Sequence, residues 1–343
     1  MAAALMVGMT GVVELERRIA GQSVVLFLGN VDVGKTTLVR RLHERVGGEV
    51  VDADLGQAEI GPPAVISLGT YQGGARAGYF GGDISPRGHF LQVLTGCKRM
   101  VAKAARPCLI DSDGYIQEGA ARAFKSELIN LIEPDLLVLL QRGRELEYYK
   151  LYASKGIAVV EIPVEHTGLK PHQERVRARE RAFRRYFATA QLRRWRLEDV
   201  GFERALLGHG EPLDVGVLSK IIGCQVVTGW KSGREAVLVL SGLAASLPVL
   251  RSELDVDFVQ LIERGALENR LVGCLVDGEF QGLGILQALN SETVDVLTPA
   301  AQASVLQVGS LKVREDGWHE RVNIQKGDPL TSTLLKDSVE SLL

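Results

Sequence analysis

The chain has 343 residues, of which 46% are hydrophobic, so it is long enough for two domains and can bury a large core. Its net charge is only −2 at pH 7, which excludes a general electrostatic attraction to polyanions. Any nucleic-acid site must therefore come from a local cluster of basic side chains.

The first residues of the chain and the spacing of its cysteines indicate the cellular compartment. Residues 1–10 lack the basic region and cleavage site of a signal peptide, and no run approaches the ~18 apolar residues of a membrane helix. We expect a cytoplasmic protein with no membrane partner, in which residues 1–20 form a short amphipathic lead-in. Reduced thiols are favoured over a disulfide framework or a zinc site, because no C-x-x-C pair occurs among Cys97, Cys108, Cys224 and Cys274.

The first motif follows the apolar run 24–28 and fits the pattern G-x-x-x-x-G-K-[ST]. Between a buried strand and a helix, this pattern predicts a phosphate-binding loop, and the alternative is a glycine-rich turn that binds nothing. Gly29 and Gly34 let backbone N–H groups turn inward, and the helix that begins near Lys35 adds the positive end of its dipole. Lys35 would contact the β- and γ-phosphates, while the Thr36 hydroxyl would hold Mg²⁺. We predict that a nucleoside triphosphate binds at Gly29, Asn30, Val31, Asp32, Val33, Gly34, Lys35, Thr36 and Thr37.

Two acids follow at the end of the next predicted strand, within residues 49–57. Asp52 and Asp54 are separated by one residue, so on a strand they point to the same side. The carboxyl ends of strands are where open α/β sheets place their sites. Each acid is therefore either an ordinary loop carboxylate or, beside a phosphate loop, a group for metal or proton chemistry.

A glycine-rich stretch, 61–106, includes the segment 81–88, whose function the sequence leaves open. A second buried strand, 108–110, then ends in the sequence Asp111-Ser112-Asp113-Gly114-Tyr115. This order places a flexible turn and an aromatic ring on the same sheet edge as the phosphate loop.

The elements that follow alternate between helices and strands. Helical spacing from 120 to 132 is closed by Pro134, and a further helix is expected near 145–153, between apolar runs at 136–140 and 157–162. Alternating strands and helices indicate an α/β fold with a doubly wound, mainly parallel sheet and helices on both faces.

An arginine-rich run is the most unusual composition in the chain, with nine arginines between residues 175 and 196. Such a run is usually a solvated helix face. However, Arg175 and Arg179 are four residues apart, so they share a helix face and can point together at one phosphate. The apolar bodies of Phe183, Tyr186 and Phe187 would anchor the same helix.

Beyond about residue 208 the chain consists of short runs rich in valine, leucine and glycine, which predict a second, mainly β domain. Trp230 and Trp318 in this part suit either base stacking or buried packing. We therefore predict three segments: the lead-in 1–20, a phosphate-loop domain 21–208 with an arginine-rich lid at about 170–196, and a β-rich domain 209–343.

Taken together, these motifs resemble the polynucleotide 5′-hydroxyl kinase family, which includes the kinase subunit of the pre-mRNA and tRNA processing complex, the ribosomal-RNA-processing kinase and smaller prokaryotic relatives. The resemblance extends from about residue 21 onward. It rests on the phosphate loop G-x-x-D-x-G-K-[ST]-T, on [DE]-x-D-x-G-Q, on a clasp [ST]-x-G-W, on a lid R-x-x-x-R with an aromatic pair, and on a closing β domain. The matching residues are Gly29, Asp32, Gly34, Lys35, Thr36 and Thr37; Asp52, Asp54, Gly56 and Gln57; Ser112, Asp113, Gly114 and Tyr115; Arg175, Arg179, Tyr186 and Phe187; and 271–286.

The resemblance implies transfer of the γ-phosphoryl of ATP to the 5′-hydroxyl end of RNA or DNA, with a single-stranded end as the expected partner. It implies that Asp54 accepts the hydroxyl proton, that Asp52 orients water on the Mg²⁺ held by Thr36, and that Lys35 with Arg175 and Arg179 stabilises the transferring group. Tyr115 would stack on a terminal base and Arg87 would touch the strand backbone. Gln57, Ser112 and Gly114 complete the substrate-binding set.

Two departures from the family pattern affect what is expected. Larger members carry an N-terminal β domain that helps to hold adenine, whereas this chain has about twenty residues there, and the loop Gln141-Arg142-Gly143-Arg144 is a substitute candidate. Tyr115 stands where larger members often have tryptophan, so we expect a weakened grip, base stacking being worth roughly 1–3 kcal/mol. The alternatives are a switch or assembly ATPase or GTPase, which the absence of N-K-x-D weakens for GTP, a small-molecule kinase, and an inactive nucleic-acid-binding module that retains ATP.

Overall fold

The computed structural model describes residues 9–19, 23–164, 168, 171–242 and 247–322. The chain forms two compact units, which divide between Ala182 and Phe183. Among the described residues, no helix has the length and apolar character needed to cross a bilayer.

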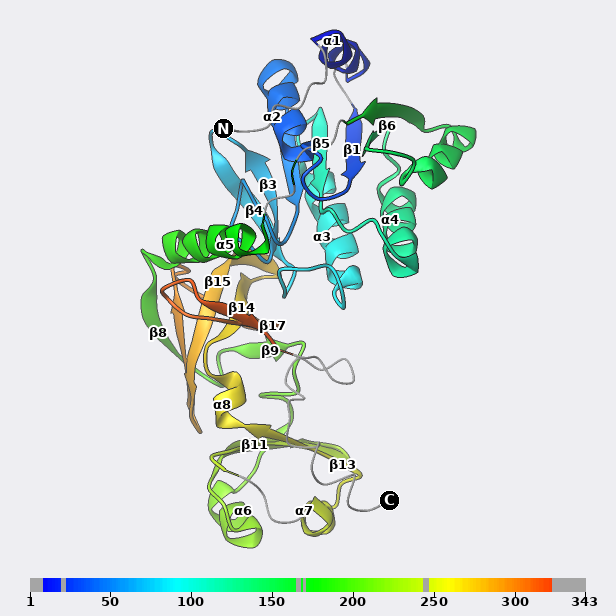
Figure 1. Cartoon of the computed structure of the whole chain (residues 1–343). Coiled ribbons are helices and arrows are strands. Elements are labelled where there is room, and N and C mark those ends of the chain that lie inside the picture. The colour runs from blue at the N-terminus through cyan, green and yellow to red at the C-terminus, as the bar shows by residue number, and fades with distance from the viewer. Residues whose placement is uncertain (1–8, 20–22, 165–167, 169–170, 243–246, 323–343) are drawn as a thin grey trace. The chain divides into compact units, whose positions relative to one another are not determined.

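A seven-stranded sheet forms the centre of the first unit, in the order β4-β3-β2-β5-β1-β6-β7 (Figure 1). Strands β2, β5, β1, β6 and β7 run parallel to one another, and β3 and β4 extend the sheet beyond β2 with antiparallel pairing. The predicted α/β class with a doubly wound, mainly parallel sheet is confirmed. The elements of this unit are α1 (Met9–Arg18), β1 (Val24–Gly29), α2 (Lys35–Val46), β2 (Glu49–Ala53), β3 (Val65–Thr70), β4 (Gly74–Phe80), α3 (Phe90–Lys103), β5 (Cys108–Ser112), α4 (Gly119–Ile132), β6 (Leu136–Gln141), the 3₁₀-helix η1 (Glu147–Lys155), β7 (Ala158–Pro163) and α5 (His172–Phe187).

The central strands β1 and β6 are buried along their whole length, and both consist almost entirely of apolar residues because helices cover the two faces of the sheet there. In β1, Leu26 and Leu28 enter a core shared with helices α3 and α4, whereas Val25 and Phe27 enter a second core shared with α2. Within the predicted lead-in, Met9–Arg18 forms helix α1, whose Leu15 is buried in the second core. The sheet is therefore held rigidly from both sides, and the carboxyl ends of β1, β2 and β5 meet at one edge.

The second unit contains two sheets, in the orders β10-β11-β12-β13 and β18-β17-β14-β15-β16-β8, with β9 paired to β17. The predicted mainly β character is therefore confirmed. Trp230 is buried in the core that includes side chains of both sheets, and Trp318 lies under the Arg314 guanidinium at 4.5 Å. The elements are β8 (Gln191–Arg196), β9 (Gly201–Glu203), β10 (Glu211–Pro212), α6 (Val215–Ile222), β11 (Val226–Ser232), β12 (Glu235–Leu240), α7 (Leu247–Leu254), β13 (Phe258–Glu263), α8 (Arg264–Leu267), β14 (Arg270–Val276), β15 (Glu279–Leu289), β16 (Thr293–Thr298), β17 (Val305–Val313) and β18 (His319–Arg321).

The division between the units differs from the expected boundary at 208/209, because it falls within α5. Strand β8 is the reason: it pairs with β16 from Gln191↔Thr298 to Arg196↔Thr293 and is part of the second unit's sheet. The predicted lid segment, about 170–196, is therefore two elements. Only helix α5 has the helical spacing on which the lid prediction rests, and Arg193, Arg194 and Arg196 belong to a strand.

Candidate active site

The phosphate loop leaves β1 at Gly29 and enters α2 at Lys35. Gly34 has a φ of 84° and Asp32 a φ of 57°, so the chain turns twice through the left-handed region before the helix begins. A Cβ on Gly29 would lie 2.7 Å from Cγ2 of Val33 and 2.9 Å from the Leu140 carbonyl oxygen, which excludes any side chain there. The loop thus has the backbone geometry that directs N–H groups inward, as its sequence predicts.

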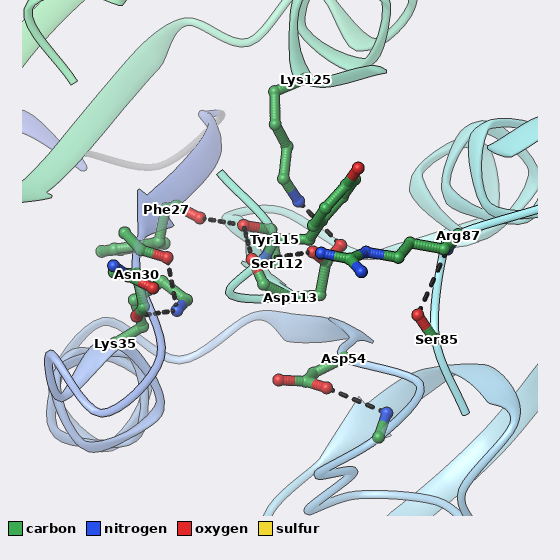
Figure 2. A network of polar contacts seen from close by, with 12 residues as sticks. Phe27, Asn30, Lys35, Asp54, Ser85, Arg87, Ser112, Asp113, Tyr115 and Lys125 are labelled. Carbon is green, nitrogen blue, oxygen red and sulfur yellow. Dashed lines mark hydrogen bonds and ion pairs between the residues drawn. The ribbon is translucent and has the colours of Figure 1, made fainter. Parts of the chain in front are cut away.

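Lys35 is only 7% exposed and points back into its own loop. Its Nζ donates to the Gly29 carbonyl at 2.9 Å and to the Asn30 carbonyl at 3.0 Å (Figure 2). Burial lowers the pKa of Lys35, and the carboxylates of Asp111 and Asp54 act in the opposite direction. The ammonium group is therefore held beside the loop by groups that a phosphate can replace.

A cavity of about 980 Å³ opens over this loop in the first unit. The phosphate loop shares this cavity with residues of the acid motif and of the predicted lid. These residues are Asp54 and Gln57 of the motif and Arg175 and Arg179 of the lid. The predicted site residues that do not line it are Gly29, Asn30, Asp52, Arg87, Ser112, Gly114 and Tyr115. The lining consists of Val31, Asp32, Val33, Gly34, Lys35, Thr36, Thr37, Arg40, Arg41, Glu44, Asp54, Gly56, Gln57, Ala58, Glu59, Pro63, Gly168, Pro171, Glu174, Arg175, Ala178, Arg179 and Ala182.

The two acids after β2 have different surroundings. Asp52 is 3% exposed and accepts backbone N–H groups on both oxygens: Asp54 at 3.2 Å on Oδ1, and Glu59 at 2.7 Å and Ile60 at 3.1 Å on Oδ2. Burial, with the nearby charge of Asp111, raises the pKa of Asp52 to about 8. Asp52 therefore holds the turn that follows β2, and its oxygens are already used.

Asp54 is half-buried and uses only one oxygen in this way, since its Oδ1 accepts the N–H groups of Gly56 and Gln57, both at 3.0 Å. Burial raises the pKa of Asp54, as does the charge of Asp113, and Lys35 opposes this change. Figure 2 shows the carboxylate between Lys35 on one side and Arg87 on the other. Asp54 lines the same cavity as the phosphate loop, where a carboxylate can contact a hydroxyl that accepts a phosphoryl group.

Asp111 lies at the end of β5, and its sequence context predicted no role for it. It is 3% exposed, pairs in register with Asp52 and interacts with the Thr36 side chain. Burial raises the pKa of Asp111 to about 6, against the opposing charge of Lys35. Its Oδ1 has no hydrogen-bond partner in the described part of the chain. The available signal was its place at the end of an apolar strand, the same signal that singled out Asp52 and Asp54.

The lid arginines reach the cavity from the first turns of α5. Arg175 pairs with Asp32 of the phosphate loop at 3.2 Å, and its carbonyl oxygen faces Nε2 of Gln57 at 3.5 Å. Burial, followed by the charge of Arg175, lowers the pKa of Arg179, whereas the charge of Asp54 raises it. Arg175 therefore contacts the phosphate loop at Asp32, and Arg179 is near enough to Asp54 for their charges to interact.

The clasp loop is positioned by contacts that use its own polar groups. The Ser112 hydroxyl is buried and donates to the Phe27 carbonyl at 2.7 Å, so it ties β5 to β1 (Figure 2). A Cβ on Gly114 would lie 2.7 Å from the backbone nitrogen of Val31, so only glycine allows the clasp to touch the phosphate loop. Ser112 and Gly114 therefore position the clasp loop against β1 and the phosphate loop.

A buried ion pair under the clasp was not anticipated. Nζ of Lys125, a side chain on α4 with no exposure, lies 2.7 Å from Oδ2 of Asp113, and Oδ1 of Asp113 accepts the Tyr115 N–H at 2.8 Å. Nothing in the sequence around Lys125 distinguishes it from a surface lysine of a helix. Only the packing of α4 against the sheet places it there.

The loop 141–144, our candidate for adenine binding, is occupied with protein contacts. Arg142 donates to the Asp32 carbonyl at 2.8 Å, and Gln141 accepts the Leu146 N–H at 2.9 Å. Glu145 accepts the backbone N–H groups of Arg142 and Gly143, both at 2.9 Å. This loop supports the phosphate loop from outside, which is a role that the sequence did not indicate.

Comparison with known proteins identifies relatives of the whole arrangement. The family model described as "mRNA cleavage and polyadenylation factor CLP1 P-loop" matches residues 29–189. A polyribonucleotide 5′-hydroxyl-kinase of Thermococcus kodakarensis is 30% identical over 333 residues, covering 89% of this chain and 92% of the relative. Kinases of the same name from Pyrococcus horikoshii and Methanocaldococcus jannaschii are 28% and 26% identical, covering 85% of this chain and 86% and 88% of their own lengths.

The fold has a counterpart among solved structures. The wild-type Clp1p–Pcf11p complex contains a chain that matches with a TM-score of 0.56 at 11% identity, covering 92% of this chain and 80% of that one. At this identity the match concerns the fold alone.

Proposed function

The chain belongs to the polyribonucleotide 5′-hydroxyl kinase family, and we propose that it transfers the γ-phosphoryl group of ATP to the 5′-hydroxyl of an RNA end. One observation carries this proposal: the phosphate loop, Asp54 and the two lid arginines line the same cavity of about 980 Å³. A loop for the phosphates, a carboxylate for the acceptor and cations for the transferring group are the parts that phosphoryl transfer needs.

On the phosphate side, the loop N–H groups and Lys35 bind the β- and γ-phosphates. The residues present fit Mg²⁺, because the buried Oδ1 of Asp111, beside the Thr36 side chain, has no hydrogen-bond partner among the described residues, and oxygen ligands of this kind suit that ion. Thr36 and Asp111 would hold it, and when bound it neutralises charge on the phosphate oxygens. We therefore transfer the metal role from Asp52 to Asp111.

On the acceptor side, Asp54 binds the 5′-hydroxyl, aligns its oxygen with the γ-phosphorus and accepts its proton. Its Oδ1 is fixed by two backbone N–H groups, so the carboxylate is oriented before the substrate arrives. Arg179 and Arg175 then compensate the negative charge that spreads over the transferring oxygens. The Arg175 contact with Asp32 gives way to a phosphate contact when the nucleotide binds.

The nucleoside end of ATP lies away from Asp54, along helix α2. The cavity follows this helix from Lys35 to Glu44, about 13 Å at a rise of 1.5 Å per residue. Arg41 and Glu44 of α2 are among the lining residues of the cavity, as are Pro171 and Glu174. We assign adenine to this region, since loop 141–144 is engaged elsewhere.

The direct test is incubation with γ-labelled ATP, Mg²⁺ and a 5′-hydroxyl RNA oligonucleotide, with the DNA oligonucleotide of the same sequence beside it. Label on the strand is the expected result, and a 5′-phosphorylated oligonucleotide serves as the control that must stay unlabelled. Label in free phosphate alone would indicate an ATPase or a switch protein. Label that remains in ATP, despite oligonucleotide binding, would indicate an inactive binding module.

A further inference from the structure

The aromatic ring of the clasp is covered in this structure. The guanidinium carbon of Arg87 lies 4.8 Å from the centroid of the Tyr115 ring, and the Phe90 ring stacks on Tyr115 at 6.2 Å with an interplanar angle of 18°. Phe90 is itself stacked on Phe124 at 4.8 Å, within the core under α3 and α4. These contacts form a column of four planar groups, from Phe124 in the core through Phe90 and Tyr115 to Arg87.

One carboxylate fixes the outer part of this column. Glu118 accepts Nη2 of Arg87 on Oε1 at 2.6 Å and the Tyr115 hydroxyl on Oε2 at 3.0 Å. The hydrogen bond to Nη2 lies in the plane of the guanidinium group, where it does not compete with a group stacked on a face. The Arg87 side chain remains 55% exposed. Figure 2 shows the guanidinium lying against the Tyr115 ring.

The backbone of Glu118 is unusual in a way that supports a functional role. Its φ is 82° and its ψ is 157°, a region that is essentially reserved for glycine. A non-glycine residue persists there only where the surroundings enforce it, and such residues cluster at ligand-binding sites. Here the two contacts of Glu118 on Arg87 and Tyr115 are lost if its side chain turns elsewhere.

We propose that the 5′-terminal base of the RNA stacks on the exposed face of the Arg87 guanidinium, with Tyr115 as the backing of that platform and not as the stacking surface itself. Guanidinium planes stack on nucleic-acid bases as aromatic rings do, and every base has a π-face, so the contact tolerates any base. The tyrosine hydroxyl has a purpose in this arrangement, because it holds Glu118, which holds Arg87. The proposal rests on the proposed function, since it names how the same site grips its acceptor.

The platform is close to the reacting groups. Gly114, directly before Tyr115, touches Val31 of the phosphate loop, and Asp113 lies near enough to Asp54 to change its pKa. Figure 2 draws Arg87, Tyr115 and Asp54 in one close view, and in the proposal the 5′-hydroxyl of the stacked nucleotide lies on the Asp54 side of the platform. A longer-range role for Arg87, contact with strand phosphates, is the alternative that the sequence suggested.

The test separates a planar contact from a purely ionic one. We would measure KM for 5′-hydroxyl RNA carrying either adenine or an abasic residue at its 5′ end, in the wild type and in Arg87→Lys and Arg87→Leu. We expect the abasic end to raise KM about tenfold in the wild type, in line with the usual strength of base stacking. In both variants the two substrates are expected to have KM values within about twofold of each other, because neither side chain presents a plane.

Arg99→Lys is the matched control. Arg99 is an exposed arginine whose guanidinium lies 5.6 Å over the Tyr79 ring, outside the residues that line the cavity. This variant is expected to keep the tenfold difference between the substrates. Glu118→Gln, which removes the charge that fixes Arg87, is expected to reduce that difference without abolishing transfer.

Three outcomes would overturn the proposal. If Arg87→Lys keeps the difference between base and abasic ends, Arg87 acts through charge. If Arg87→Leu keeps or increases it, the base stacks on Tyr115 once the arginine is removed. If the wild type transfers phosphate equally well to both ends, no base stacks there, and the kinase proposal itself still stands. Only a failure of the wild type to label either RNA would count against the kinase proposal.

Discussion

Helix α5 and strand β8 take their arginines from one continuous run of sequence, and the two elements use them differently. In α5, Arg175 and Arg179 are one helical turn apart and both line the cavity over the phosphate loop. In β8, Arg194 is bound to Asp295 at 2.7 and 2.8 Å, and Arg196 lies 2.7 Å from Glu198. The comparison teaches that the element and its register, and not the local density of arginine, decide which guanidinium groups are available to a phosphate.

The largest expected effect tests the α5 half of this comparison. Arg179→Ala is expected to reduce the rate of transfer by about 10³-fold or more, as the loss of an arginine that compensates a transferring phosphoryl group does. Single-turnover transfer from γ-labelled ATP to a 5′-hydroxyl RNA, at saturating ATP, is the measurement. A loss smaller than about tenfold would place Arg179 among the solvated arginines of the run.

Asp52 and Asp54, two acids at the end of β2, show a similar contrast, because Asp54 lines the cavity and Asp52 supports the turn that follows the strand. Asp54→Asn is expected to lower kcat by about 10² to 10⁴, the usual contribution of a general base. Asp52→Asn is expected to lower kcat much less and to lower stability instead, because Asp52 binds three backbone N–H groups of the turn. Measurement of kcat and of urea unfolding for both variants separates the two roles. Equal losses of kcat at unchanged stability would restore the metal role to Asp52.

A third contrast concerns two buried lysines, Lys35 in the cavity and Lys125 beneath the clasp. Lys125→Met leaves the buried carboxylate of Asp113 without its partner, and we expect unfolding to become easier by about 3–5 kcal/mol. Lys125→Met combined with Asp113→Leu should recover most of this loss, because no buried charge then remains unpaired. Urea midpoints of both variants check this. A single variant with wild-type stability would mean that water reaches Asp113.

The smallest expected effect tests the β8 half of the comparison. Arg194→Ala removes an ion pair whose arginine side chain is 65% exposed, so solvent screens the pair and the urea midpoint should hardly change. Its rate of transfer should equal that of the wild type at low ionic strength. A substantial increase in KM for RNA, with kcat unchanged, would give β8 a part in binding the strand that its ion pairs do not suggest.

Much of the site was predictable from the sequence wherever its geometry is local. The phosphate loop is nine consecutive residues whose glycines dictate the turn, and Asp54 and Gln57 belong to one short motif after a strand. The spacing of Arg175 and Arg179 places them on one helix face in any context. Val31 to Thr37 of the loop, Asp54, Gln57, Arg175 and Arg179 line the cavity as expected, whereas Gly29 and Asn30 do not. The chemical roles of all these residues stay predictions.

The parts that escaped prediction depend on residues far apart in the chain. Arg142 supports the phosphate loop across 110 positions, and the stacked column joins Arg87 to Phe124 through Tyr115 and Phe90. Ser112 looked like a substrate contact by motif, yet its hydroxyl reaches across the sheet to Phe27.

The sequence by itself determined the fold class, the phosphate loop and the family, because each follows from apolar periodicity or from short motifs whose spacing sets their geometry. Only the tertiary structure decided that Asp111 and not Asp52 has an unused oxygen beside Thr36, that Lys125 is buried, and that the arginine run ends in a different sheet. The physical reason is that burial and pairing depend on which side chains the packed elements bring together. No pattern along the chain states the distance between a lysine of α4 and an aspartate of the clasp.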